Sequence, residues 1–509
     1  MDRKWLAVLA AVAVYCAFLF AFAGCGGGGG GGGEGGGSVL PVGGLPEYNW
    51  SNHFGGGTGI TAARGIAVDT EGNIYIGGQF EQMVNFAADF GGTETKTSDG
   101  GADIFITKIN ASRNHSWTRR IGGPGNDAAY GIAVDASGNI YIAGCFRNAV
   151  NFQKDFNAAD PKTSVGGTDI FITKINANGN YGWTKTIGGT ANDVAYGIAV
   201  DTLGNVYIAG GFEGTVNFAA GFTGTENKSS GGGADIFVTK INADGTYGWT
   251  KTIGGNGNDV AYGIAVDSSD NVYITGYFRN AVNFGADFGA TDNKTSFGGT
   301  EDIFITKINA NGTYGWTKTI GGTGDDVAYG IAVDTSGNIY ITGSFQGSPD
   351  FAADFSGGAD EISSNGHDDI FLTKVTGNGD YGWTRGMGGS GIDRADAIAV
   401  DGAGNIYLGG SFEQTVNFAA GFGGSDSKIS AGSTDIFITK INQDGTYGWT
   451  RRIGGGDDDQ GLGITLNQTG TLYMTGAFAG NVNFGSDFGK SNYKNSAGIV
   501  DAFLTKITP

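Results

Sequence analysis

Residues 131–145 read GIAVDASGNIYIAGC, and this stretch decides the fold because it returns at a fixed interval. Its opening Gly-Ile-Ala-Val-Asp also starts at Gly65, Gly197, Gly263 and Gly330, and recurs as Ala397-Ile-Ala-Val-Asp and Gly463-Ile-Thr-Leu-Asn. A tryptophan series keeps the same step of 66 or 67 residues: Trp50, Trp117, Trp183, Trp249, Trp316, Trp383 and Trp449. The chain therefore contains seven copies of one unit.

One unit, taken from Gly197 to Ile253, contains four short apolar segments. Residues 197–201, 206–212, 235–241 and 247–253 are rich in β-branched and aromatic residues. Turns rich in Gly, Asn and Asp separate the first from the second and the third from the fourth. Helical periodicity is absent from the sequence of the unit, and breakers are frequent. Four strands per unit predict a β-propeller blade.

The phase of the two series predicts how the ring closes. Residues 49–56 match the fourth strand of a unit, such as residues 182–189, but they precede the first unit. The last unit ends after its third strand, residues 501–507. We therefore expect an all-β, seven-bladed β-propeller of four-stranded antiparallel blades, closed by the N-terminal strand completing the C-terminal blade. A solenoid is the structural alternative, and it would leave open sheet edges.

The pattern Gly-Ile-Ala-Val-Asp-x-x-Gly-Asn-Ile-Tyr-Ile-x-Gly resembles the bacterial SBBP repeat, named for seven-bladed β-propellers. Residues 131–145 and 330–344 carry it clearly, and the resemblance extends over about residues 47–509. The Asp-Ile-Phe-Ile-Thr-Lys-Ile and Gly-Trp-Thr strands are also similar to those of SBBP-type lipoproteins. The resemblance implies a propeller at the cell surface or in secreted form.

The N-terminus predicts export. A basic start is followed by an apolar run from Trp5 to Ala23, which is typical of a secretory signal, although its length is also compatible with a membrane anchor. The end of the run, Phe22-Ala23-Gly24-Cys25, resembles the bacterial lipobox, which implies lipidation of Cys25. We expect a lipoprotein signal peptide at 1–24, a lipidated Cys and Gly-rich tether at 25–46, and the propeller at 47–509.

These features predict the location of the protein. It is expected to be lipid-anchored at the cell envelope, and at the outer membrane in a host with two membranes, because Gly26 rather than Asp follows Cys25. Cys145 is the third cysteine besides Cys16 and Cys25, so we expect a free thiol and no disulfide framework.

The charge balance argues against nucleic acid as a partner. The 30 basic and 50 acidic residues become 28 and 49, a net charge of −21, once Asp2, Arg3 and Lys4 leave with residues 1–24. Such a surface repels nucleic acid and anionic membranes. The expected partners are the membrane, through the lipid, and an envelope protein or surface polymer, with the protein itself a monomer.

Two loop sets are expected to share one face of the ring, where a ligand would bind. They are the long second-to-third-strand loops, which vary most in sequence, and the fourth-to-first-strand loops. Six aspartates precede the first strands on that face, and carboxylates that converge there suit Ca²⁺. They are Asp127, Asp193, Asp259, Asp326, Asp393 and Asp459. The alternative is that each caps its own turn.

The sequence favours a non-enzymatic binding or scaffold module. His53, His115 and His367 lie at unrelated phases of the repeat, and no catalytic triad order, phosphate loop or cofactor motif is evident. The alternative is an envelope enzyme of lyase or glycan hydrolase type on the same face. Its best candidate residues are Ser348 to Asp350 with His367 to Asp369, in the fifth unit. The seven tryptophans are expected to pack between blades.

Overall fold

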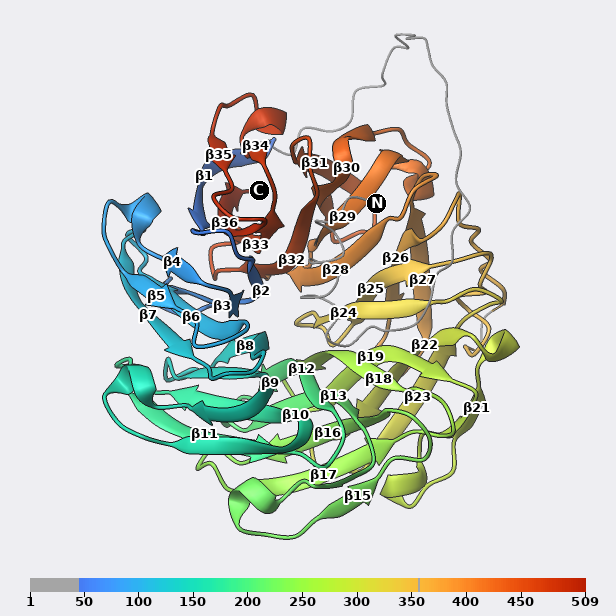
Figure 1. Ribbon diagram of the computed structural model, residues 1–509. Helices are drawn as coiled ribbons and strands as arrows, with labels where there is room; N and C mark the ends of the chain where they lie inside the picture. Colours follow the sequence, from blue (N-terminus) through green and yellow to red (C-terminus); the bar gives the residue numbers. More distant parts are fainter. Residues whose placement is uncertain (1–44, 356–357) are drawn as a thin grey trace.

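The computed structural model describes residues 45–355 and 358–509. These residues form seven four-stranded antiparallel sheets that radiate from a central axis (Figure 1). We number the sheets as blades 1 to 7, from the blade that begins with β2 to the blade that begins with β32. The expected all-β, seven-bladed propeller is confirmed. The signal peptide, Cys25 and nearly all of the tether lie outside the described residues.

Strand order is the same in every blade, from the axis outwards. The innermost strands are β2 (Thr61–Val68), β8 (Ala128–Val134), β12 (Asp193–Val200), β18 (Val260–Val266), β24 (Val327–Val333), β28 (Arg394–Val400) and β32 (Asp459–Leu466). The second strands are β3 (Ile74–Phe80), β9 (Ile140–Asn151), β13 (Val206–Phe212), β19 (Val272–Arg279), β25 (Ile339–Phe345), β29 (Ile406–Asn417) and β33 (Leu472–Phe478).

The outer half of each blade contains the third and fourth strands. The third strands are β6 (Asp103–Ile109), β10 (Pro161–Ile175), β16 (Asp235–Ile241), β22 (Glu301–Ile308), β26 (Asp369–Val375), β30 (Ser427–Ile441) and β36 (Asp501–Thr508). The outermost strands are β7 (His115–Ile121), β11 (Tyr181–Ile187), β17 (Tyr247–Ile253), β23 (Tyr314–Ile320), β27 (Tyr381–Met387), β31 (Tyr447–Ile453) and β1 (Glu47–Phe54).

The ring closes through β1, as the phase of the repeat predicts. This strand pairs antiparallel with β36 and completes blade 7, with Trp50 opposite Lys506. The same pairing joins Trp117 to Lys108 within blade 1. The Ser51 hydroxyl lies 2.8 Å from that of Thr505, in the place of the Thr107–Thr118 pair of blade 1. Strands about 450 residues apart in sequence therefore form one blade.

The hydrophobic core lies between adjacent blades. Trp117 of blade 1 packs against a cluster that includes Ile132 and Phe171 of blade 2, which confirms the expected packing role of the tryptophans. At the axis the blades approach each other very closely. A Cβ on Gly65 would lie 2.9 Å from Cγ2 of Ile132, so a side chain at Gly65 would require Ile132 to shift.

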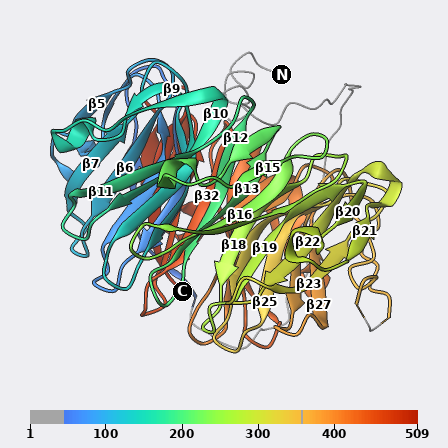
Figure 2. The same ribbon diagram turned by 90° about the horizontal axis from the view of Figure 1, so that it is seen from below.

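The long second-to-third-strand loops lie at the outer rim of the ring (Figures 1 and 2). Four of them contain a separate hairpin: β4 (Met83–Asn85) with β5 (Thr95–Thr97), β14 (Thr215–Asn217) with β15 (Asn227–Ser229), β20 (Ala281–Asn283) with β21 (Asn293–Thr295), and β34 (Asn481–Asn483) with β35 (Tyr493–Asn495). The 3-10 helices are η1 (Ala88–Phe90), η2 (Lys154–Phe156), η3 (Ala220–Phe222), η4 (Ala286–Phe288), η5 (Phe297–Gly299), η6 (Ala420–Phe422) and η7 (Ser486–Phe488).

These loops join neighbouring blades. Six of the 3-10 helices, all except η5, contact the outermost strand of the preceding blade. Asp155 of η2 accepts hydrogen bonds from the backbone N–H of Arg120 and from the ammonium of Lys96, both in blade 1. The loops vary in sequence, yet most share one fold and one contact, so their variability does not by itself mark a ligand surface.

Among the described residues, no helix is both long and apolar enough to cross a membrane.

Closure predicts a large effect for one residue of β1. Phe54 is fully buried, and Ile121 occupies the equivalent place in blade 1. We expect Phe54→Ala to lower the free energy of unfolding by about 3–5 kcal/mol, because it leaves a cavity between blades 7 and 1. Denaturant unfolding of residues 45–509 measures this, with Ile121→Ala as the matched control. An effect below about 1 kcal/mol, beside a large effect of Ile121→Ala, would contradict closure through β1.

Candidate functional site

Every innermost strand bulges at one residue, and the residue at this position differs between the blades. In blade 1, Ala63 pairs with Gly78 and Gly65 pairs with Gly77, so Arg64 has no partner across the ladder. A β-bulge re-aims the side chain of its extra residue. We call the seven bulge residues the channel ring: Arg64, Tyr130, Tyr196, Tyr262, Tyr329, Asp396 and Leu462.

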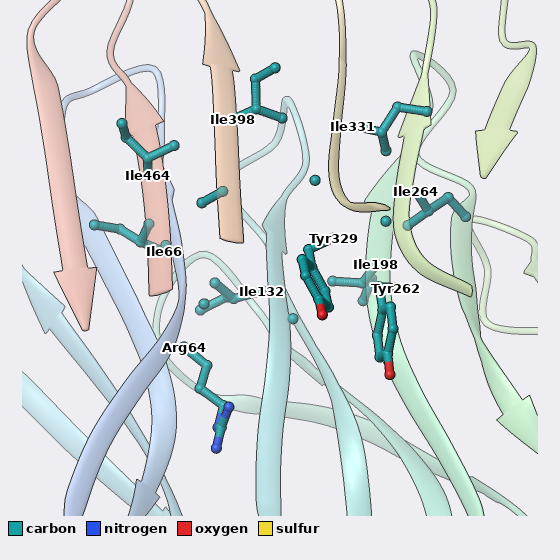
Figure 3. A pocket seen from close by; sticks show the side chains of 17 residues that line it. Arg64, Ile66, Ile132, Ile198, Tyr262, Ile264, Tyr329, Ile331, Ile398 and Ile464 are labelled. Atoms are coloured by element: carbon teal, nitrogen blue, oxygen red, sulfur yellow. The ribbon is translucent and has the colours of Figure 1, made fainter. Parts of the chain in front are cut away.

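The channel ring lies in the central channel. A cavity of about 190 Å³ is lined by Arg64, Tyr262 and Tyr329 together with the glycine or alanine and the isoleucine that follow each ring position. In Figure 3 the Arg64 guanidinium and the hydroxyls of Tyr262 and Tyr329 point away from the isoleucines, toward the same side. The ring precedes the isoleucines in each strand, so it lies nearer the face that carries the fourth-to-first-strand loops.

Four consecutive tyrosines form an arc around the channel. Ring centroids lie 5.1 Å apart for Tyr130 and Tyr196, 5.0 Å for Tyr196 and Tyr262, and 5.3 Å for Tyr262 and Tyr329. Such spacings and tilted geometries are favourable for aromatic pairs. Burial raises the pKa of Tyr329 to about 12, so its hydroxyl stays protonated at neutral pH.

Arginine guanidinium groups cover both ends of the tyrosine arc. The Arg394 guanidinium lies 4.5 Å from the Tyr329 ring centroid and 2.6 Å from Oδ1 of Asp396. The Arg64 guanidinium lies 5.1 Å from the Tyr130 ring centroid, and no carboxylate of the described residues lies within ion-pair distance of it. Burial raises the pKa of Asp396, and the charges of Arg394 and Arg64 oppose that shift. The channel thus contains one paired and one unpaired guanidinium.

The polar atoms of this site are incompletely satisfied. Within the described part of the chain, Nε and Nη2 of Arg64 and Oδ2 of Asp396 are buried and have no hydrogen-bond partner. Nε and one Nη form the edge of a guanidinium that binds a carboxylate in a bidentate manner. Unpartnered buried atoms also occur elsewhere in the described chain, for example Oδ1 of Asp103 and Nε of Arg119, and Arg64 differs from these in that its side chain lines the channel cavity.

The six aspartates predicted as calcium ligands each bind backbone of their own blade. Asp127 accepts hydrogen bonds from the N–H of Gly123 (2.9 Å) and of Arg147 (2.9 Å), and Asp193 does the same with Gly189 and Glu213. The other four repeat this geometry: Asp259, Asp326, Asp393 and Asp459. Each carboxylate joins the fourth-to-first-strand loop to the end of the second strand.

These contacts favour turn capping over cation binding. Burial raises the pKa of Asp127 and Asp193 to about 7, and the two backbone N–H groups partly oppose that shift. Among residues 45–355 and 358–509, no group of three or more His, Cys, Asp or Glu side chains could hold a metal ion. Calcium binding at the six aspartates stays a prediction.

The other candidates from the sequence do not meet in one site. Ser348 bonds to Ser363 on the rim, whereas the carboxylate of Asp368 accepts a 2.6 Å hydrogen bond from Gln346. In the described chain, no hydrogen bond or ion pair joins Ser348 to His367. Cys145 is a buried free thiol, and burial raises its pKa to about 12.

The channel ring was not predicted from the sequence, although a signal for it exists. It is the position directly before the glycine of each Gly-Ile segment. There the chain reads Arg, Tyr, Tyr, Tyr, Tyr, Asp and Leu in units 1 to 7, while the positions around it hardly change. Aligning the seven units and asking which inner-strand position varies would have found it.

Comparison with known proteins agrees with this architecture. The SBBP beta-propeller repeat matches residues 49–79, 116–144, 182–210, 248–277 and 315–344. The chain contains SBBP repeats. Each match runs from an outermost strand through the first two strands of the next blade. The resemblance seen in the sequence is thus confirmed in five of the seven units.

Two curated relatives match the SBBP propeller at low identity. The uncharacterized WD repeat-containing protein L264 of Acanthamoeba polyphaga mimivirus is 23% identical over 433 residues, which are 71% of this chain and 31% of that protein. The regulatory protein FlaEY of Caulobacter vibrioides is 24% identical over 466 residues, which are 87% and 45% of the two chains. The chain thus spans less than half the length of either relative.

Solved structures similar to this SBBP propeller include the Pan2 WD40 domain of Neurospora crassa and virginiamycin B lyase of Staphylococcus aureus. The first has a TM-score of 0.39 and 9% identity, and covers 90% of this chain and 97% of its own. The second has a TM-score of 0.36 and 11% identity, and covers 87% and 95%.

The aspartate geometry predicts a stability effect without calcium dependence. Asp193→Asn replaces one acceptor oxygen by an NH₂ group that faces a backbone N–H, so we expect a loss of about 1–3 kcal/mol in the free energy of unfolding. Thermal unfolding in EDTA and in millimolar calcium, for both the wild-type domain and the variant, measures this. The melting temperature is expected to be the same in both buffers. A rise with calcium that Asp193→Asn abolishes would restore the cation hypothesis.

Proposed function

We propose that this protein is an exported, lipid-anchored envelope propeller that binds a ligand in its central channel and has no enzymatic activity of its own. The fold supports a binding or scaffold module in general terms. Lipidation at Cys25 and the Gly-rich tether are inferred from the sequence, and they supply the anchor. The ligand belongs to an envelope protein or a surface polymer.

The observation that carries this proposal is the channel ring. Six of its seven members are aromatic or charged, whereas the positions beside them repeat as small or aliphatic residues. Packing between blades accounts for the repeated residues, because every blade needs the same contacts. It does not account for an unpaired Arg64 or an unsatisfied Asp396 in the channel. Residues that differ between equivalent blades of a rigid scaffold are where binding specificity is expected.

The ring also determines which surface we assign to the ligand. The sequence favours the face with the long second-to-third-strand loops and the fourth-to-first-strand loops. Most of the long loops are committed to contacts between blades, as described above. The channel opening among the fourth-to-first-strand loops is therefore the proposed entrance.

A binding assay with fractionated envelope tests the channel. The domain of residues 45–509 is sedimented with isolated cell wall, surface polysaccharide or outer-membrane vesicles of the host. We expect Tyr262→Ala, which opens the tyrosine arc, to weaken binding at least tenfold. The matched control is Tyr493→Ala, because Tyr493 is 66% exposed on a long loop at the rim. If Tyr493→Ala abolishes binding and Tyr262→Ala leaves it intact, the site lies on the loops and not in the channel.

The anchor is tested separately by metabolic labelling. Cells that express the full chain are grown with a palmitate analogue, and the protein is analysed for the label. We expect the wild-type chain to be labelled and Cys25→Ser to be unlabelled and released from the membrane fraction, because the substitution removes the only thiol at the lipobox. Cys145→Ser is the control and should keep the label. A wild-type protein without label would contradict the anchor.

A further inference from the structure

Arg64 is an uncompensated positive charge in the channel. The two guanidinium groups of the channel differ, because Arg394 is paired with Asp396 at 2.6 Å and Arg64 has no carboxylate within ion-pair distance among the described residues. A charge that is largely removed from water is costly unless a partner of opposite sign is supplied. An anionic ligand would supply that partner.

The free atoms of Arg64 define the shape of the anion. Its unpartnered atoms, Nε and Nη2, form a planar two-donor edge that matches the two oxygens of a carboxylate. This edge faces neighbouring protein atoms, while the side chain as a whole lines the cavity. Binding therefore requires the guanidinium to turn from the Tyr130 ring toward the cavity.

The volume and the other lining residues of the cavity indicate the size and polarity of the ligand. Its volume of about 190 Å³ is close to the ~150 Å³ of an engineered cavity that binds benzene, so it accepts one six-membered ring. Tyr262 and Tyr329 present aromatic surface to that space. In Figure 3 the hydroxyls of Tyr262 and Tyr329 point to the same side as the Arg64 guanidinium, so they can exchange hydrogen bonds with hydroxyls of a ligand whose carboxylate binds Arg64.

We infer that the channel binds a cyclic hydroxycarboxylate of the size of a single hexuronic acid, held by Arg64 through its carboxylate and by the hydroxyls of Tyr262 and Tyr329 through its own hydroxyls. This inference rests on the proposed function and names its ligand class. The apolar C–H face of such a ring lies against the tyrosines. Terminal uronic acids of a surface polysaccharide carry this group.

The probes are glucuronate, glucose and benzoate, measured by calorimetric titration of residues 45–509. Glucose lacks the carboxylate, and benzoate lacks the hydroxyls. We expect glucuronate to bind at least tenfold more tightly than either. Arg64→Gln should weaken glucuronate binding at least tenfold, and Arg64→Lys should restore only part of it, because an ammonium lacks the two-donor edge. Melting temperatures show whether each variant is folded.

Arg147→Gln is the matched control, because it removes the same charge from an exposed position at the end of the second strand of blade 2. It should leave glucuronate binding unchanged. Equal affinity for glucose and glucuronate, no effect of Arg64→Gln, or an equal effect of Arg147→Gln would each overturn the carboxylate at Arg64. Benzoate binding as tightly as glucuronate would overturn the role of the ligand hydroxyls.

The same titrations separate this inference from the proposed function. Binding of a probe or envelope fraction that is lost in Tyr262→Ala but kept in Arg64→Gln would show that the channel is a binding site. It would also show that the ligand is not a hydroxycarboxylate held by Arg64. If Tyr262→Ala changes no binding to envelope fractions, the channel itself is wrong as the site.

Discussion

The antiparallel pairing of β1 with β36 is the contact on which the whole ring depends. It joins the two ends of the described chain within one blade, and it buries Tyr48 and Phe54 between blades. Every other blade is completed by strands that are close in sequence, so it forms from local contacts. Blade 7 is complete only when β1, from the other end of the described chain, pairs with β36. Packing of all seven inner strands around one axis requires this closure, because an open ring would expose the edge of β36.

The repeated packing of the blades explains why the fold could be predicted from the sequence. Six of the seven blades have glycine where the inner strands nearly touch, as at Gly65, with Ala397 in blade 6, and a large aromatic residue fills the space between the outer strands, as at Trp117. These packing requirements recur in each blade, so they appear in the sequence at a fixed interval. The phase of this repeat predicted that Trp50 would lie opposite Lys506. Physical constraints that repeat are visible to sequence reasoning.

The candidate site was harder to predict for a physical reason. Alternation along a strand tells which residues share a face, but a bulge inserts one residue and breaks the alternation. Nothing in the sequence around Arg64 therefore shows that its side chain lines the channel. The rim loops pose the opposite difficulty, because their sequence variability does not by itself mark a ligand surface. Asp155 and Gly221 occupy the same place in η2 and η3, and so a loop that varies in sequence can keep one structural contact.

The place where β1 begins has a consequence for orientation. Glu47 lies opposite Thr508, at the end of blade 7 that carries the short turns, and Leu45 before it is exposed. If Cys25 is lipidated as we propose, the anchor is joined to the propeller at its short-turn face. In an anchored molecule the short-turn face would be turned toward the lipid surface. The channel entrance near Arg64 would then face away from the lipid. The channel of the anchored propeller would then open on the side opposite to the membrane.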